Sequence, residues 1–137
     1  MSTMTEPFRY PRSWVVVLGL CPPPGWPCTP TFGDLPSISA KRMDTTMPDW
    51  REHGLGANLW WTHAEWDAGL PHHLEQVVRQ TRCRTIVALG REVQRELDLP
   101  HGEFFTWADV VVADKDLRVL RFPHPSGLCH VWNEEEN

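Results

Sequence analysis

The sequence has no hydrophobic segment long enough to cross a membrane. Its longest apolar run, from Trp14 to Leu20, has seven residues, whereas a membrane-spanning helix needs about 20. The N-terminus contains an acid and prolines where a signal peptide would need an apolar stretch. We therefore expect a soluble cytoplasmic protein whose cysteines are reduced thiols.

Motifs for metals and nucleotide cofactors are also missing. The chain has 4 cysteines but no C-x-x-C pair, because Cys21 and Cys28 lie seven residues apart and Cys83 and Cys129 stand alone. The sequence contains no H-E-x-x-H motif and neither of the glycine-rich motifs that bind ATP or dinucleotides. It therefore predicts no metal site and no cofactor.

Lysine is scarce, and acidic residues outnumber basic ones. Only Lys41 and Lys115 are lysines among 13 basic residues, and 18 acidic residues give a net charge of −5. A protein that coats duplex DNA should be basic, because neutralising phosphates drives nonspecific affinity. The charge is still compatible with a local basic cleft that binds DNA, or with a free nucleotide as ligand. The excess of arginine over lysine could also reflect genomic base composition alone.

Tryptophan and proline, in contrast, are abundant. The 137 residues include 8 tryptophans and 13 prolines, which indicates a loop-rich protein with large, rigid side chains. The indoles could fill a core or stack on planar ligands. The length fits a single domain over residues 1–137, with residues 1–12 as a poorly ordered arm and residues 134–137 as an acidic tail.

Apolar runs that end at glycine or proline alternate with helical patterns. The predicted strands cover 14–19, 57–61, 84–90, 109–113 and 117–122, the last two forming a hairpin, and the predicted helices cover 71–82 and 91–98. Residues 29–55 are predicted to form a long loop with at most one short helix near 36–43. This order predicts an α/β fold, a three-layer sandwich around a mostly parallel sheet, with ligands bound at the carboxyl ends of the strands.

The motifs at these strand ends occur in a familiar order. The first predicted strand runs into Gly19-Leu20-Cys21-Pro22, the second contains Asn58-Leu59, the third ends in Val87-Ala88-Leu89-Gly90, and the last leads to His124-Pro125-Ser126-Gly127. In this order the chain resembles the uracil-DNA glycosylase superfamily, over about residues 14 to 133. The most specific element of the resemblance is the His-Pro-Ser-Gly sequence at a strand end.

The resemblance implies a DNA glycosylase fold and a role for each motif. His124 would stabilise the negative charge on a departing base, and Asn58 would read a pyrimidine edge. The loop that begins at Gly19 and Leu20 would position water or another acceptor, with Cys21 at the catalytic position. The resemblance also implies a base-stacking aromatic, either Phe32 or Trp26, and a phosphate contact from Ser126 and Gly127. The short chain suggests a specialised, phage-type member.

One departure from the family pattern keeps the activity open. The family usually offers a carboxylate or amide where this chain has Cys21, and a thiol is a weak hydrogen-bonding group and a poor base for water. The sequence is therefore compatible with hydrolysis or transfer at an N-glycosidic bond, and with binding of a nucleotide or modified base without cleavage. A third hypothesis is a tryptophan-rich module that binds another protein.

Overall fold

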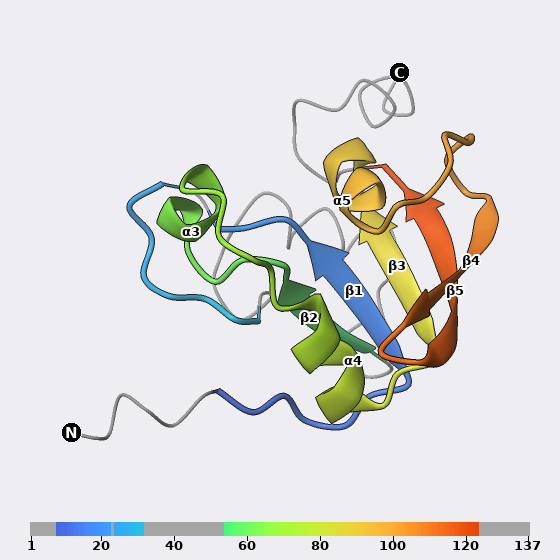
Figure 1. Cartoon of the computed structure of the whole chain (residues 1–137), viewed down its shortest axis with the longest axis horizontal. Coiled ribbons are helices and arrows are strands. Elements are labelled where there is room, and N and C mark those ends of the chain that lie inside the picture. Colours follow the sequence, from blue (N-terminus) through green and yellow to red (C-terminus); the bar gives the residue numbers. More distant parts are fainter. Residues whose placement is uncertain (1–7, 23, 32–53, 124–137) are drawn as a thin grey trace, which may run out of the picture.

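A computed structural model of the chain describes residues 8–22, 24–31 and 54–123. Its centre is one five-stranded sheet with the order β2-β1-β3-β5-β4 (Figure 1). β1 pairs in parallel with β2 and β3, β3 pairs in parallel with β5, and β4 runs antiparallel at the edge. The predicted α/β class with a mostly parallel sheet is confirmed. The strands are β1 (Val15–Gly19), β2 (Gly54–Asn58), β3 (Thr85–Leu89), β4 (Trp107–Val112) and β5 (Lys115–Phe122).

Three helices lie in the described part of the chain, two of them at predicted places. These are α4 (Leu74–Thr81) and α5 (Arg91–Glu96), both shorter than predicted. The third, α3 (His63–Asp67), was not predicted, although Thr62 and Glu65 form a capping box in which each side chain accepts from the other residue's backbone N–H.

The second strand lies three residues earlier than predicted. The sequence placed it at 57–61 because of the apolar run there, but β2 ends at Asn58. Leu59 and Trp60 are buried beyond the sheet, in the core. Glycines at 54 and 56 have low β-propensity, so the true strand carries a weak local signal and forms because β1 offers it a parallel partner.

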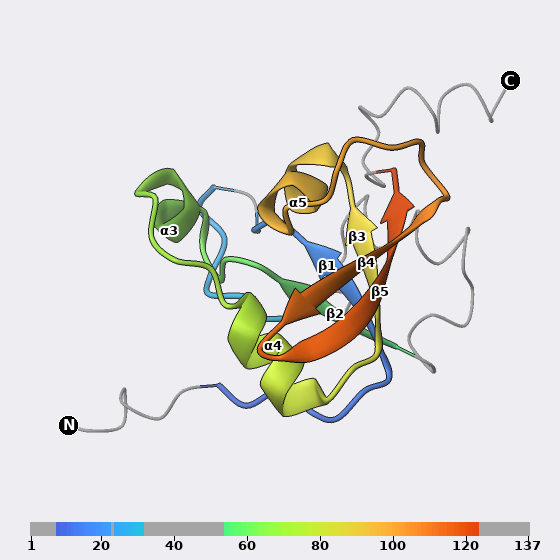
Figure 2. The ribbon, with the colours of Figure 1, turned by 45° about the vertical axis from the view of Figure 1, so that its right-hand side comes forward.

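The predicted hairpin is confirmed, and its turn is tighter than expected. β4 and β5 pair from Trp107 with Leu120 to Val112 with Lys115, so the turn consists of Ala113 and Asp114. Both have positive φ, 52° and 63°, which is the backbone of a type I′ turn and matches the twist of the strands. Figure 2 shows the resulting long, twisted ribbon at the edge of the sheet.

The two faces of the sheet carry separate hydrophobic clusters. The larger cluster joins one face of β1, β3 and β5 to α4 and α5, with Val16, Leu18, Ile86, Val77, Val78 and Val93 among its buried members. The opposite face contributes Val17, Val87, Leu89 and Phe122, and no described helix contributes to this cluster. The described residues thus form the sheet and one helical layer of the expected sandwich.

The segment before β1 corrects another expectation. The composition assigned residues 1–12 to a poorly ordered arm, but the Tyr10 side chain is 3% exposed and belongs to the main cluster. Its backbone N–H donates to Gln80 Oε1 at 2.7 Å, and Phe8 accepts a hydrogen bond from Gln76 Nε2 at 2.7 Å. Residues 8–12 are therefore attached to α4.

In the described part of the chain, no helix has both the length and the apolar character that crossing a bilayer requires.

Candidate functional site

The carboxyl ends of the parallel strands meet along one edge of the sheet, which we call the carboxyl edge. The strand register aligns Asn58 of β2 with Gly19 of β1, and Leu89 of β3 with Phe122 of β5. From this edge the chain leads from β1 to β2 on one side, and from β3 towards β5 on the other. The point between β1 and β3 is therefore a topological switch point, where open α/β sheets bind their ligands.

Backbone hydrogen bonds close the β1–β2 side of this edge. Leu59 N–H donates to Gly19 O, and Trp60 N–H donates to Leu20 O, both at 2.9 Å. The predicted ligand-loop residues Gly19 and Leu20 therefore have carbonyls that already bind the chain after β2. This fixes the start of the loop that leads to Cys21.

A buried glutamine closes the β3–β5 side. Gly90 N–H donates to Phe122 O at 2.8 Å. The Gln94 side chain, 4% exposed on α5, donates from Nε2 to Ala88 O at 3.1 Å and to Phe122 O at 3.2 Å. Gln94 therefore holds the ends of two strands at a fixed separation, immediately before Pro123 and the predicted His124 loop.

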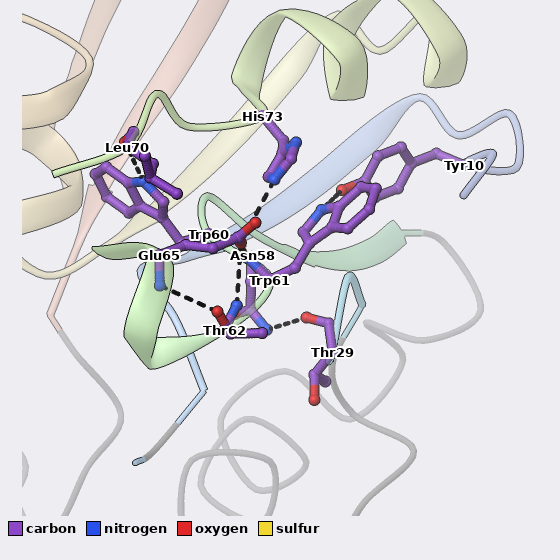
Figure 3. A network of polar contacts seen from close by, with 9 residues as sticks. All are labelled: Tyr10, Thr29, Asn58, Trp60, Trp61, Thr62, Glu65, Leu70 and His73. Atoms are coloured by element: carbon purple, nitrogen blue, oxygen red, sulfur yellow. Dashed lines mark hydrogen bonds and ion pairs between the residues drawn. The ribbon is translucent and has the colours of Figure 1, made fainter. Parts of the chain in front are cut away.

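Asn58 is held in one orientation at the end of β2. Its side chain is 5% exposed, and Nδ2 donates to Thr29 O at 2.9 Å (Figure 3). That bond identifies which amide atom is the nitrogen and directs it towards the loop after β1. Among the described residues none donates to Asn58 Oδ1. The amide oxygen and the second N–H therefore have no hydrogen-bond partner among the described residues.

Cys21 is a half-buried, neutral thiol. Burial raises its pKa above the usual value, and the negative charge of Glu92 in the first turn of α5 raises it further. Both effects oppose a thiolate, which is the nucleophilic form of cysteine. The influence of Glu92 was not foreseen, because residues so far apart in sequence meet only when β1 and β3 pair.

A buried arginine near the end of β5 was also missed. The Arg121 side chain is 6% exposed and donates to Thr106 Oγ1 at 3.0 Å, to Pro100 O at 3.0 Å and to Trp107 O at 3.4 Å. Within the described residues it forms no ion pair. A Cβ at Gly102 would come within 2.6 Å of Arg121 Cζ, so a side chain at this position would displace the guanidinium. Nothing in the sequence distinguishes this arginine from the exposed ones.

Beyond Asn58, a tryptophan is held on three sides (Figure 3). Trp61 Nε1–H donates to the Tyr10 hydroxyl at 2.7 Å. The Trp61 ring stacks on His73, with ring centres 4.0 Å apart and planes 16° from parallel. Glu65 Oε1 accepts from Trp61 N–H at 2.9 Å and lies 3.6 Å from His73 Nε2. These contacts fix the segment that follows β2.

The predicted site residues fall into two groups. Gly19, Leu20, Cys21 and Asn58 lie at the carboxyl edge, and Trp26 is half-buried in the loop after β1. Phe32, His124, Ser126 and Gly127 lie outside the described residues, as does the expected helix near 36–43, and their roles stay predictions. Within the ranges that the structure describes, no three His, Cys, Asp or Glu side chains group as metal ligands.

Comparisons of the chain with protein-family models, with curated proteins and with solved structures found no match.

Proposed function

We propose that the protein is a short relative of the uracil-DNA glycosylases and that its carboxyl edge recognises a pyrimidine base of nucleic acid. The observation that carries the proposal is the Asn58 amide, oriented by Thr29 O at the carboxyl end of β2, the strand beside the topological switch point. The motif order along the chain and the mostly parallel sheet support it as well. The proposed fold includes the three-layer arrangement of that family.

The chemistry of an amide suits a uracil-type edge. The base presents an N–H donor beside a carbonyl acceptor, and Asn58 can meet them with Oδ1 and its second Nδ2–H. A good bidentate pair is worth about 1–3 kcal/mol in discrimination between bases. Because Thr29 O holds the first Nδ2–H, the amide cannot turn over to accept the opposite pattern without losing that bond.

The state of Cys21 favours recognition of a base over hydrolysis. A thiol whose pKa is raised by burial is neither a water base nor a thiolate nucleophile at neutral pH. Cleavage, if the protein performs it, rests on His124, which would donate to the base as negative charge develops on it. Binding of a modified base or nucleotide without cleavage is therefore the second candidate function.

Calorimetric titration with deoxyuridine, compared with deoxyadenosine, tests recognition. Asn58→Ala should weaken deoxyuridine binding roughly thirtyfold, and Gln76→Ala, which removes an amide from α4 far along the chain, should leave it unchanged. In the unmodified protein, deoxyuridine should slow alkylation of Cys21 by iodoacetamide, a readout that does not depend on the folding of a variant. Equal affinity for both nucleosides, without protection of Cys21, would refute the proposal.

A second assay separates the two candidate functions. A single-stranded oligonucleotide containing one uracil is incubated with the protein, and the released base is measured. Release of uracil supports an N-glycosidic-bond enzyme, whereas tight binding with the base retained supports a binding protein of the same fold.

A further inference from the structure

The end of the sheet opposite the carboxyl edge contains a basic hollow. A cavity of about 680 Å³ lies where β1, β3 and β5 begin. These strands begin at the lower right of the sheet in Figure 1. Three segments line it: residues 12–14 before β1, residues 81–85 between α4 and β3, and the first residues of β5. None of the residues used for the proposed function lies here.

The hollow is strongly cationic in an acidic protein. Five cations and one carboxylate line it, a formal charge of +4 in a chain whose net charge is −5. Within the described residues, none of the five forms an ion pair with a carboxylate. Their charges are therefore available to an anionic ligand. The cations are Arg12, Arg82, Arg84, Lys115 and Arg118.

The backbone beneath these cations is fixed. Arg84 N–H donates to Trp14 O at 2.9 Å, and Arg118 N–H donates to Arg84 O at 3.1 Å. Cys83, between two exposed arginines, is 1% exposed and anchors the turn in the core. The guanidinium groups thus extend from a rigid frame, which lowers the entropy lost when they bind.

Two exposed indoles flank the arginines. Trp14 is 64% exposed, and the Arg84 guanidinium carbon lies 5.0 Å from its ring centre. Trp107 is 47% exposed, and the corresponding distance to Arg118 is 4.6 Å. Trp14 and Arg84 lie just before β1 and β3 and line the hollow, whereas Trp107 of β4 lies outside it, opposite Leu120 and beside Arg118. The two pairs come from four neighbouring strands or the residues just before them, which span roughly 14 Å at the usual strand spacing. Aromatic rings beside arginines are typical of surfaces that bind single-stranded nucleic acid.

The backbone at Arg82 adds an independent observation. This residue ends α4 in the left-handed conformation, with φ 57° and ψ 36°, where glycine or asparagine is usual. An arginine is strained there, yet its side chain lines the hollow. Strain of this kind is often found at functional sites, where the side chain has a use that outweighs it.

We propose that this basic surface, consisting of the five cations with Trp14 and Trp107, binds single-stranded nucleic acid. The cations contact phosphates and the indoles stack on unpaired bases. The two arginine–tryptophan pairs together span more of the sheet than one nucleotide covers, which favours a strand over a free nucleotide. This inference does not depend on the proposed function at the carboxyl edge.

Fluorescence anisotropy with a labelled dA12 strand tests it, since an all-adenine strand gives a pyrimidine site no ligand. Arg82→Gln/Arg84→Gln should weaken binding roughly sixtyfold at 50 mM salt and reduce the slope of log K against log salt by about 1.4. The matched control, Arg79→Gln/Arg95→Gln, makes the same change in net charge on exposed sites outside the hollow and should change affinity less than threefold.

Two further variants separate binding from folding. Arg82→Gly should weaken dA12 binding and raise Tm by roughly 3 °C, because glycine relieves the strain of the left-handed backbone. If Arg82 had only a structural role, affinity would not fall while stability rises. Trp107→Ala should weaken binding about tenfold, whereas Val111→Ala, exposed on the same strand, should not. The inference fails if dA12 does not bind, if both double variants lose affinity equally, or if paired dA12·dT12 binds as tightly as dA12.

Discussion

The two ends of the sheet differ in chemistry more than its two faces do. At the carboxyl edge, strand-end carbonyls are bonded, Asn58 is 5% exposed and Cys21 is a neutral thiol. At the amino end, cations lie without ion pairs among the described residues and Trp14 is 64% exposed. Neutral, oriented groups suit an uncharged base, and a cluster of cations suits phosphates. The two proposals thus assign base recognition and strand binding to opposite ends of one small sheet.

The strongest test of this division is His124→Ala. We expect it to weaken base cleavage or base recognition about a hundredfold, or roughly 3 kcal/mol, because an oriented donor to a developing negative charge is lost. Cys21→Ser should change the same activity little, since a hydroxyl replaces a neutral thiol of similar size. Steady-state rates or calorimetric affinities measure both. If Cys21→Ser loses this activity while His124→Ala keeps it, the protein uses a covalent thiol mechanism instead.

The closure of the carboxyl edge can be broken at Gln94. Gln94→Leu keeps the volume but leaves the carbonyls of Ala88 and Phe122 without their side-chain donor. We expect the free energy of unfolding to fall by about 2–3 kcal/mol, measured by urea denaturation. Gln76→Leu, which removes a less buried bond to Phe8 O, should cost under 1 kcal/mol. Equal losses would show that Gln94 does not hold the strand ends.

Alkaline titration tests the burial of the Tyr10 side chain. Burial raises the pKa of Tyr10 to about 12, from an ordinary value of 10. The unfolded chain therefore loses this proton first, so a stabilisation of about 2 kcal/mol, present below pH 10, is lost as the pH rises to 12. Tyr10→Phe should lose less stability over that interval. Since the chain has one tyrosine, tyrosinate absorbance measures the pKa directly, and a midpoint near 10 in the folded protein would contradict the burial.

The smallest expected effect concerns Cys21 and Glu92. Glu92→Gln removes a negative charge that raises the thiol pKa, so the pKa should fall while remaining above its usual value because of burial. The rate of alkylation of the Cys21 peptide against pH measures this. Glu96→Gln on the same helix serves as the control. An unchanged pH profile in Glu92→Gln would mean that burial alone raises the pKa of the Cys21 thiol.

The sequence predicted the elements whose signals are local. β1, β3 and the hairpin are apolar, β-branched runs, and α4 has an amphipathic pattern. β2 was predicted at the wrong position because its glycines weaken the strand signal. α3 was not predicted, although its capping box can be recognised in the sequence. The carboxyl-edge position of Asn58 was predicted, but its bond to Thr29 O was not. The Arg84–Trp14 and Arg118–Trp107 pairs join residues distant in sequence, so no periodicity reveals them.

The position of β1 has a consequence for biosynthesis. Among the described strands, the first to be made is an internal one, which pairs with β2 on one side and with β3 on the other. Its Val-Val-Val-Leu-Gly segment can pair with β2 once Asn58 has been added, but its other edge must wait without its native partner until the ribosome has added Thr85–Leu89. An apolar, uncharged strand in that state readily joins strands of other chains. Yield during expression should thus depend on temperature and chaperone supply more than the stability of the finished fold suggests.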